Sequence, residues 1–227
     1  MNKKAVVLLS GGIDSTTCLA LAVEKYGKED VVGLSLRYGQ KHVREIESSR
    51  KVAQFYGIDH IERDLDSIYD YSDCTLLSGN ADIKHQSYSK QLGDLEGEGT
   101  VDTYVPFRNG LFLAVASAIA LSVKAEVIYY GAHADDAAGR VYPDCTPEFK
   151  DAMNKAIYEG SGRLLKMEAP LLHMNKAEVV KTGVELKAPY ELTWSCYEGL
   201  QNPCGECGTC IDRKTAFEIN GLIDPAN

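Results

Sequence analysis

Short apolar runs alternate along most of the chain with segments whose apolar positions have helical spacing. Runs with the length and composition of strands occur at residues 5–9, 31–36, 60–65, 127–130 and 166–169. The helical spacing predicts helices at residues 16–24, 42–56, 109–123, 146–158 and 175–186. The helix at 109–123 is strongly apolar, so we expect it to be buried. This alternation predicts an α/β fold with a doubly wound, mostly parallel sheet, in which ligands bind at the carboxyl ends of the strands.

Two segments depart from this alternation. Residues 66–104 are polar, contain four glycines and show no sustained periodicity, so we expect a lid, a binding loop or a flexible excursion there. Residues 191–227 contain a cluster of cysteines instead of a further strand and helix. We therefore expect a main α/β domain over residues 1–190 and a small C-terminal lobe over residues 191–227, packed together as a single domain.

Composition and charge narrow the possible partners. The 227 residues have a formal net charge of −9, and no basic stripe is visible that would attract a nucleic acid. No apolar run approaches the length of a membrane span, and the chain enters its first strand directly, which leaves no room for a signal peptide. We expect a cytoplasmic protein that acts on a small molecule and binds neither nucleic acid nor membrane.

The first predicted strand leads directly into the segment Ser-Gly-Gly-Ile-Asp-Ser at residues 10–15. Two glycines allow a tight turn with accessible backbone N–H groups, the serines add hydroxyls, and the next helix presents its N-terminus. These features favour a polyphosphate site, although no Gly-Lys-Ser/Thr follows, so the turn is not a Walker A loop. Asp14 beside phosphate indicates a bridging Mg²⁺. The alternative is a plain strand–turn–helix corner with a serine cap.

Four cysteines near the C-terminus have the spacing Cys-x7-Cys-x2-Cys-x2-Cys. Soft thiolates in this pattern, without an open position, predict a closed structural zinc site formed by Cys196, Cys204, Cys207 and Cys210. An iron–sulfur cluster is the main alternative. Disulfides are a poor alternative, since nothing suggests secretion and three other cysteines would stay unpaired. We expect zinc to fold the lobe, whose glycine-rich and proline-containing segment is poor in apolar residues.

Further polar residues follow the predicted strands or open the predicted helices. They are Tyr38, Gln40, His42, Arg108, Asn109, Asp136, Asp144 and Lys176. Arg108 can pair with a carboxylate or a phosphate, while Asn109 alternatively caps a helix. An aspartate at a strand end can bind a metal, act as a base, or accept the N–H edge of a purine-type ring. The alternatives are an ordinary surface or capping histidine at His42 and a solvated acidic loop for the aspartates.

The Ser-Gly-Gly-Ile-Asp-Ser segment resembles the PP-loop of the N-type ATP pyrophosphatases. The finer pattern resembles the 7-cyano-7-deazaguanine synthases of queuosine precursor biosynthesis, and the similarity runs from residue 5 to about residue 218. The matching segments are Tyr38-Gly39-Gln40 with His42 and Glu45, Val105-Pro106 with Arg108-Asn109, Asp136, Tyr142-Pro143-Asp144-Cys145, Pro147-Glu148-Phe149, and the four cysteines after Trp194-Ser195. Two departures are visible. Phe107 stands where the pattern leads us to expect glycine, and the segment between Asp136 and Tyr142 is slightly longer than usual.

The resemblance implies an adenine-nucleotide alpha hydrolase-like fold and an ATP-dependent ligase that forms carbon–nitrogen bonds. The substrates would be 7-carboxy-7-deazaguanine and ammonia, and the product 7-cyano-7-deazaguanine would form through an activated carboxylate and an amide. It further implies ATP and Mg²⁺ as cofactors, a structural zinc and a homodimer. ATP would contact Leu8, Leu9, Ser10, Gly11, Gly12, Ile13, Asp14, Ser15, Thr16, Thr17 and Cys18.

The same resemblance implies that Asp14, Ser15 and Arg108 are catalytic. The deazaguanine substrate would contact Tyr38, Gln40, His42, Arg108, Asn109, Asp136, Asp144 and Lys176. Asp144 or Asp136 would accept the N–H edge of the ring, and Arg108 would hold the substrate carboxylate or stabilise developing charge.

Two functions of other classes compete with this interpretation, and a related ligase is a third alternative. A PP-loop tRNA-thiolating enzyme would use the cysteines for an iron–sulfur cluster, but it would need a basic surface for RNA, which this acidic chain does not indicate. A non-enzymatic zinc module would leave the phosphate-binding turn unexplained. A different amidating ligase of the same superfamily would differ only in its substrate.

Overall fold

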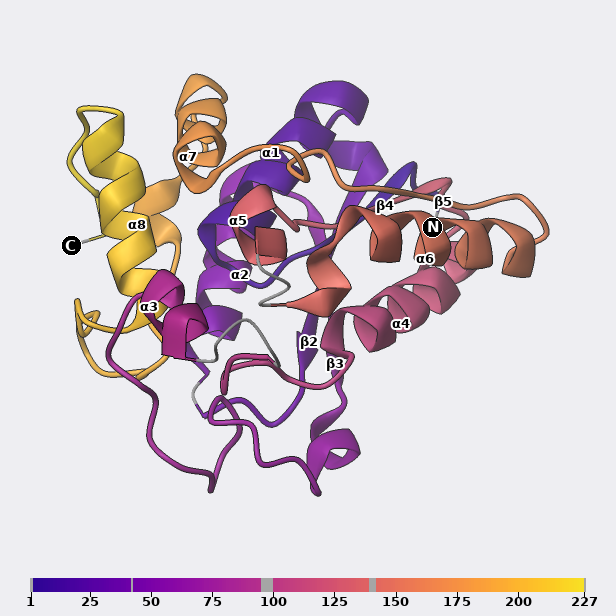
Figure 1. The fold of residues 1–227 in the computed structure, drawn as a ribbon. Coiled ribbons are helices and arrows are strands. Elements are labelled where there is room, and N and C mark those ends of the chain that lie inside the picture. Colours follow the sequence, from indigo (N-terminus) through magenta and orange to yellow (C-terminus); the bar gives the residue numbers. More distant parts are fainter. Residues whose placement is uncertain (1, 42, 95–99, 139–141, 227) are drawn as a thin grey trace.

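A five-stranded parallel sheet with the order β3-β2-β1-β4-β5 forms the centre of the protein (Figure 1). This computed structural model describes residues 2–41, 43–94, 100–138 and 142–226. The strands are β1 (Ala5–Leu8), β2 (Val31–Arg37), β3 (Asp59–Asp64), β4 (Val127–Tyr129) and β5 (Lys166–Glu168). The strand order reverses at β1, which pairs with β2 on one side and with β4 on the other. Open parallel sheets bind ligands at such a reversal, and here the turn at residues 10–12 follows it directly.

Helices cover both faces of the sheet. The helices of the described residues are α1 (Ile13–Tyr26), α2 (Arg44–Tyr56), α3 (Tyr88–Asp94), α4 (Arg108–Ser122), α5 (Ala134–Ala137), α6 (Pro147–Gly160), α7 (Lys176–Glu185) and α8 (Gly208–Ile219). Helices α1, α2, α7 and α8 lie on one face of the sheet, and α4 and α6 lie on the other. Successive residues of β1 point to opposite faces, so Val7 packs with α1, α2, α7 and α8, whereas Val6 packs with α4 and α6. The predicted doubly wound α/β fold is therefore confirmed.

The five predicted strands and the five predicted helices are all present, with ends that shift by a few residues. The helix that follows the turn at residues 10–12 begins at Ile13, three residues earlier than predicted. Helix α6 begins as its sequence indicates: Thr146 Oγ1 accepts the Phe149 N–H at 3.2 Å, and Pro147 occupies the first helical position. Asn175 and Glu178 form a capping box at α7.

The expectation that the helix at 109–123 is buried is wrong. Helix α4 buries Gly110, Leu113, Ala116 and Ala120 against the sheet, but Ala114 lies at the surface and Leu121 is 40 % exposed. A helix on the outer layer of a sheet has one solvent face whatever its composition. The apolar composition of α4 therefore leaves an apolar strip at the surface.

Helices α3, α5 and α8 were not predicted. Helix α8 follows the cysteine cluster and places Phe217 in the core beneath the sheet, where its ring packs edge-on against Tyr190 at 5.7 Å. The end of the chain is thus part of the core shared with α1, α2 and α7. Among the described residues, no helix has both the length and the apolar composition needed to cross a membrane.

The described parts of residues 66–104 pack against the cysteine cluster. Leu76, Leu77 and Ile83 are buried in one apolar cluster together with Cys196 and Cys207. Outside this cluster, His85 lies 2.8 Å from Glu198 and 3.1 Å from Glu206, two carboxylates that flank the cysteines. This polar segment is therefore anchored by a few apolar side chains that have no periodic spacing.

Candidate active site and metal centre

The turn between β1 and α1 is closed by its own serine side chains. The Gly11 N–H donates to Ser15 Oγ at 3.2 Å, and the hydroxyls of Ser10 and Ser15 lie 3.1 Å apart. Gly11 has φ +88°, and a Cβ at this position would collide with the backbone of Glu45 and Ser49 on α2. The close contact with α2 therefore requires glycine, and the turn presents backbone and hydroxyl groups as a phosphate site requires.

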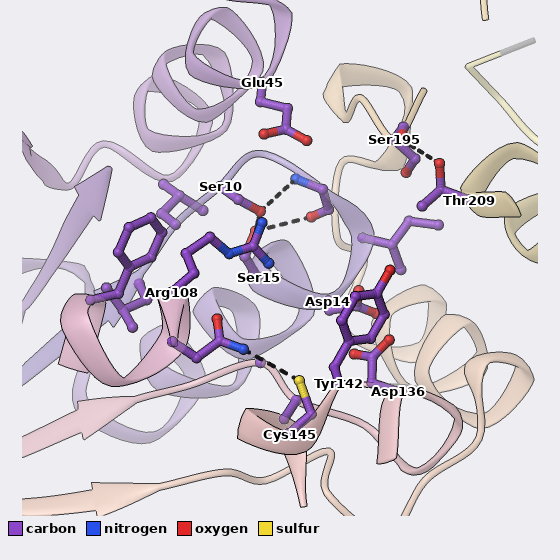
Figure 2. A pocket seen from close by; sticks show the side chains of 18 of the residues that line it. Ser10, Asp14, Ser15, Glu45, Arg108, Asp136, Tyr142, Cys145, Ser195 and Thr209 are labelled. Carbon is purple, nitrogen blue, oxygen red and sulfur yellow. Dashed lines mark hydrogen bonds between the residues drawn. The ribbon is translucent and has the colours of Figure 1, made fainter. Parts of the chain in front are cut away.

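A pocket opens at this turn and collects side chains from most of the elements around the sheet (Figure 2). Its walls come from the carboxyl ends of β1, β2 and β4, from the starts of α2, α4 and α7, and from the cysteine lobe. Of the residues predicted to bind nucleotide or substrate, the lining contains Leu8, Leu9, Ser10, Gly12, Ile13, Asp14, Ser15, Tyr38, Gln40, Arg108, Asn109, Asp136 and Lys176.

A charged cluster forms the part of the pocket beside α1 and α7. Lys176 Nζ lies 2.7 Å from both carboxylate oxygens of Asp14 and 3.3 Å from His133 Nε2. His133 Nε2 is also 3.4 Å from the carboxylate of Asp136. Burial raises the pKa of Asp136, an effect that the nearby His133 only partly offsets. In this cluster Lys176 can therefore bind a phosphate and Asp14 can bind a metal ion, while Asp136 offers a basic carboxylate.

Arg108 provides the positive charge on the opposite wall. Its Nη1 donates to the Tyr38 hydroxyl at 3.1 Å, and its guanidinium lies 5.3 Å from the centre of the Tyr38 ring and 5.9 Å from that of Phe112. Burial alone would lower the pKa of Arg108, but Tyr38, Tyr197 and Glu45 raise it well above its ordinary value. A guanidinium that lies against two aromatic rings, with donors left for a ligand, is suited to hold a carboxylate or phosphate.

Asp144 lies beside the pocket but is not part of its lining. Its carboxylate accepts the backbone N–H of Asn109 at 2.9 Å, close to the start of α4, and only 3 % of the residue is exposed. The Asn109 side chain is directed away from a capping position, since its amide lies 3.3 Å from Cys145 Sγ. Asp144 therefore stabilises the first turn of α4, which carries Arg108 into the pocket.

Other residues predicted to bind the nucleotide or the substrate lie away from the pocket. Thr16, Thr17 and Cys18 are fully buried in α1, where Thr17 Oγ1 lies 2.7 Å from the Tyr190 hydroxyl. Gly11 shapes the turn from behind, against α2. Thr16, Thr17 and Cys18 are buried because α1 packs against a face of the sheet, so that only the first residues of this helix lie at the strand ends. His42 lies outside the described residues.

The pocket also contains polar side chains that were not predicted as site residues. They are Glu45, Thr103, His133, Tyr142, Trp194, Ser195, Tyr197, Thr209 and Asp212. Asp212 and Thr209 come from α8, and the backbone N–H of Trp194 donates to the Gly11 carbonyl at 3.0 Å. Burial raises the pKa of Asp212 to about 6. No local sequence pattern indicates that α8 contributes to a pocket built around a turn near the N-terminus. Glu45 and Tyr142 could have been found, because they lie in segments that carry the family resemblance.

The four cysteines converge next to this wall. The sulfurs of Cys196, Cys204, Cys207 and Cys210 all lie within 4.8 Å of one another. Backbone N–H groups donate to Cys196 Sγ at 3.3 Å and 3.4 Å and to Cys204 Sγ at similar lengths. Donation from the thiols of Cys196 and Cys210 lowers the pKa of Cys207, so that a thiolate forms readily.

These distances fit zinc. A tetrahedral zinc with bonds of about 2.3 Å holds its four sulfurs roughly 3.8 Å apart, so the cluster needs only a small contraction to bind it. An iron–sulfur cube would hold four thiolates further apart, because its iron and sulfide atoms lie between them. The four-cysteine cluster fits a zinc site, and zinc there would join α8 to the segment that carries Trp194 and Ser195.

The sheet order, the turn after β1 and the pocket above it define an α/β enzyme fold of the PP-loop type. Solved structures with this fold include the NMN synthetase from Francisella tularensis, with a TM-score of 0.54 and 16 % identity over 98 % of this chain and 79 % of that one. The tRNA thiolase NcsA from Methanococcus maripaludis, solved with its 4Fe–4S cluster, has a TM-score of 0.51 and 18 % identity over 97 % and 66 % of the two chains.

Sequence comparison identifies the particular family. Residues 4–221 match the family model described as queuosine biosynthesis protein QueC. The chain is 40 % identical to the 7-cyano-7-deazaguanine synthase of Archaeoglobus fulgidus over 98 % of this chain and 89 % of that one. It is 43 % identical to the enzyme of that name from Thermoplasma volcanium, over 99 % and 90 % of the two chains. The chain belongs to the QueC family.

Proposed function

We propose that this protein is an ATP-dependent ligase that converts 7-carboxy-7-deazaguanine and ammonia into 7-cyano-7-deazaguanine. The relatives that share about 40 % of its sequence over nearly their whole length have the name of this enzyme. The observation that carries the proposal is the pocket itself, in which the phosphate-binding turn at residues 10–15 and the guanidinium of Arg108 line the same space. A ligase that activates a carboxylate with ATP needs this combination.

The chemistry explains why both groups are required. A carboxylate is a poor electrophile, so its oxygen must first become part of a leaving group, which ATP supplies. We propose that Ser10, Gly12 and Ser15 hold the phosphates, and that Asp14 and Lys176 complete this site. Mg²⁺ bound at Asp14 would neutralise phosphate charge. Arg108 would hold the substrate carboxylate against the phosphates, and ammonia would then displace the activated oxygen to give an amide.

Recognition of the ring is proposed for the wall that carries Asp136. Its carboxylate lines the pocket and can accept the two N–H donors of a guanine-like edge. Asp144 accepts a backbone N–H instead, so we propose an indirect role for it through the start of α4. Tyr38, Gln40 and Asn109 would complete the substrate contacts. A second activation of the amide oxygen, at the same turn, would remove that oxygen and leave the nitrile.

We further propose the wider organisation that the resemblance implies. Residues 1–190 would form the nucleotide-binding domain, residues 66–104 a covering segment, and residues 191–227 a zinc lobe that packs with them as a single unit. A homodimer is proposed because the outer side of α4 exposes apolar surface, including Leu121, that a second copy could cover. We place the enzyme in the cytoplasm, where queuosine precursors would be made.

The direct test is product formation. The purified protein is incubated with ATP, Mg²⁺, ammonium and 7-carboxy-7-deazaguanine, and the products are identified by mass spectrometry. We expect the amide to appear first and the nitrile to follow. If neither forms while the protein is folded and contains zinc, the proposed function is wrong. Asp14→Ala and Ser15→Ala should abolish turnover and leave the zinc content unchanged, since the turn and the cysteines are separate sites.

A further inference from the structure

Glu45 is a carboxylate in the pocket to which the chemistry above assigns no role. It is the second residue of α2, and the first turn of that helix packs directly on Gly11 of the phosphate-binding turn. Figure 2 shows its side chain extending from α2 toward the turn at Ser10. Within the described parts of the chain, its carboxylate forms no hydrogen bond and no ion pair, so its oxygens are available to a ligand.

The surroundings of Glu45 favour a cationic ligand. The pocket must accept the phosphates of ATP and the carboxylate of the substrate, and a further carboxylate repels both. Asp14 is neutralised by Lys176, and Asp136 lies 3.4 Å from His133. Among the described residues, no cationic group lies within ion-pair distance of the Glu45 carboxylate, and the charge of Arg108 acts on it only from further away. Burial raises the pKa of Glu45, and the charge of Arg108 opposes that rise only in part. A small cation beside Glu45 would remove the repulsion.

We propose that Glu45 binds the ammonium ion that supplies the nitrogen and accepts one proton from it. The inference rests on the proposed function, because the amidation consumes ammonia, which is mostly ammonium in neutral water. Ammonium has no lone pair and cannot attack carbon. A site that concentrates ammonium and deprotonates it next to the activated carboxylate would remove that obstacle.

The position of Glu45 suits this step. The activated carboxyl group of the substrate must lie between the phosphate-binding turn and Arg108. Glu45 borders this space beside Gly11. An N–H bond of ammonium breaks, its proton goes to the carboxylate of Glu45, and the nitrogen keeps the electron pair. That pair forms the C–N bond while the C–O bond to the phosphate leaving group breaks. A second proton leaves the nitrogen with the phosphate group, and Glu45 returns its proton to water.

Charged and titratable groups on neighbouring elements act on this carboxylate. Arg108 at the start of α4 and Tyr38 after β2 both interact electrostatically with Glu45. Burial raises the pKa of Tyr38 to about 12, so its hydroxyl stays neutral at the pH of the reaction. The raised pKa of Glu45 makes it a stronger base than an exposed glutamate, which favours proton transfer from ammonium.

The test compares two nucleophiles that differ in charge. Ammonium must lose a proton before it reacts, whereas hydroxylamine is mostly uncharged at neutral pH and reacts directly. For Glu45→Gln, we expect kcat/KM for ammonium to fall about a hundredfold. Amidation by hydroxylamine should be little changed. The defect with ammonium should shrink as the pH rises, because more of the nucleophile is then already ammonia. Glu47→Gln, on the exposed side of the same helix, is the matched control and should behave as wild type.

Each outcome decides between interpretations. An equal loss with ammonium and hydroxylamine would place Glu45 in ATP or ring binding and overturn the proposal, as would a higher Mg²⁺ requirement with either nucleophile. If Glu45→Gln does not fold, Glu45→Asp keeps the charge on a shorter side chain. That variant should lose activity selectively with ammonium, and an unselective loss overturns the proposal. Failure of the wild-type protein to form any product instead contradicts the proposed function.

Discussion

Lys176 and Asp14, 162 residues apart in the chain, form an ion pair in which the lysine Nζ lies 2.7 Å from both carboxylate oxygens. Burial alone would raise the pKa of Asp14, but the charges of Lys176 and His133 outweigh it, and the net shift is downward. Burial alone would lower the pKa of Lys176, but Asp14 and Asp136 reverse this shift. Both groups are therefore charged at neutral pH, and the pair ties the start of α7 to the start of α1.

This pair should stabilise the fold over a defined range of pH. A double-mutant cycle of Asp14→Asn and Lys176→Met should give a coupling free energy of about 1–3 kcal/mol in urea unfolding at neutral pH. The lowered pKa of Asp14 means that its contribution is complete above its ordinary value of 3.8 and is lost as the pH falls through the folded-state pKa. The raised pKa of Lys176 means that its contribution is complete below 10.5 and is lost as the pH rises beyond that value.

The coupling should therefore be constant from about pH 5 to about pH 9. Equal coupling in low and moderate salt would show that the pair is shielded from solvent, consistent with side chains that are 18 % and 26 % exposed. A coupling near zero at neutral pH would contradict the ion pair as the link between the two helices.

Zinc binding should stabilise one wall of the pocket as well as the C-terminal lobe. Helix α8 begins immediately after Cys207 and carries Thr209 and Asp212 into the pocket, while the backbone N–H of Trp194 donates to the carbonyl of Gly11 in the turn after β1. Cys207→Ser should lose zinc, lower the unfolding temperature and weaken ATP binding. Trp194 is the single tryptophan of the sequence and lies in the pocket wall, so its fluorescence can report the binding.

The control for this variant is Cys18→Ala, which changes a fully buried cysteine in α1, outside the metal cluster. It should keep one zinc per chain and retain ATP binding, with a modest loss of stability from the smaller side chain. Wild-type affinity for ATP in a zinc-free, folded Cys207→Ser protein would show that the lobe does not shape the pocket.

Local patterns were sufficient to predict the sheet, because each strand is a short apolar run and each crossover helix has an amphipathic face or a clear cap. They were also sufficient for the tight turn between β1 and α1, where the required backbone geometry restricts the residues directly. The pocket wall formed by the C-terminal lobe could not be predicted in the same way. Asp212 and Ser195 lie on either side of the cysteine cluster and reach the pocket through long-range contacts of the C-terminal segment, which local spacing does not encode.

The outcome for Asp144 shows a second limit of sequence analysis. A carboxylate in a loop near a strand end is compatible both with ligand binding and with helix capping. Tertiary packing determines which carboxylate accepts the free backbone N–H of the helix. Here the Asn109 N–H lies within reach of Asp144, so that aspartate is used structurally, and Asp136 is left in the pocket. No spacing rule distinguishes the two residues.

Phe107 has a backbone conformation that suits glycine. Its φ is 54°, in the left-handed region, and its N–H donates to the Tyr104 hydroxyl at 2.9 Å. The ring packs edge-on against Phe149 at 6.0 Å, and Gly110 leaves the space that the ring needs, since a Cβ there would collide with it. The glycine expected at this position would relieve the backbone and lose the ring contact.

Comparing Phe107→Gly with Phe107→Ala separates these two effects. Both variants lose the ring, but only glycine relaxes the left-handed backbone, so Phe107→Gly should be the more stable of the two by up to about 1 kcal/mol. Urea unfolding of both variants measures the difference. An alanine variant as stable as the glycine variant would show that the backbone at Phe107 carries no cost.

Asp136 and Asp144 should respond differently to the same substitution. Asp136→Asn replaces an acceptor with a donor in the pocket, and the loss of a buried hydrogen bond to a ligand costs about 1–3 kcal/mol, so KM for 7-carboxy-7-deazaguanine should rise roughly 5- to 150-fold. Asp144→Asn weakens the stabilisation of the first turn of α4, so the free energy of unfolding should fall by about 1 kcal/mol with a smaller change in KM.

Steady-state kinetics and urea unfolding of the two variants measure both effects side by side. The informative comparison is between the KM increases of the two variants, because Asp136 lines the pocket whereas Asp144 accepts the Asn109 N–H behind it. A KM defect that is larger for Asp144→Asn than for Asp136→Asn would reverse the assignment. The substrate ring would then displace the Asn109 N–H from Asp144, and helix α4 would have to shift when the substrate binds.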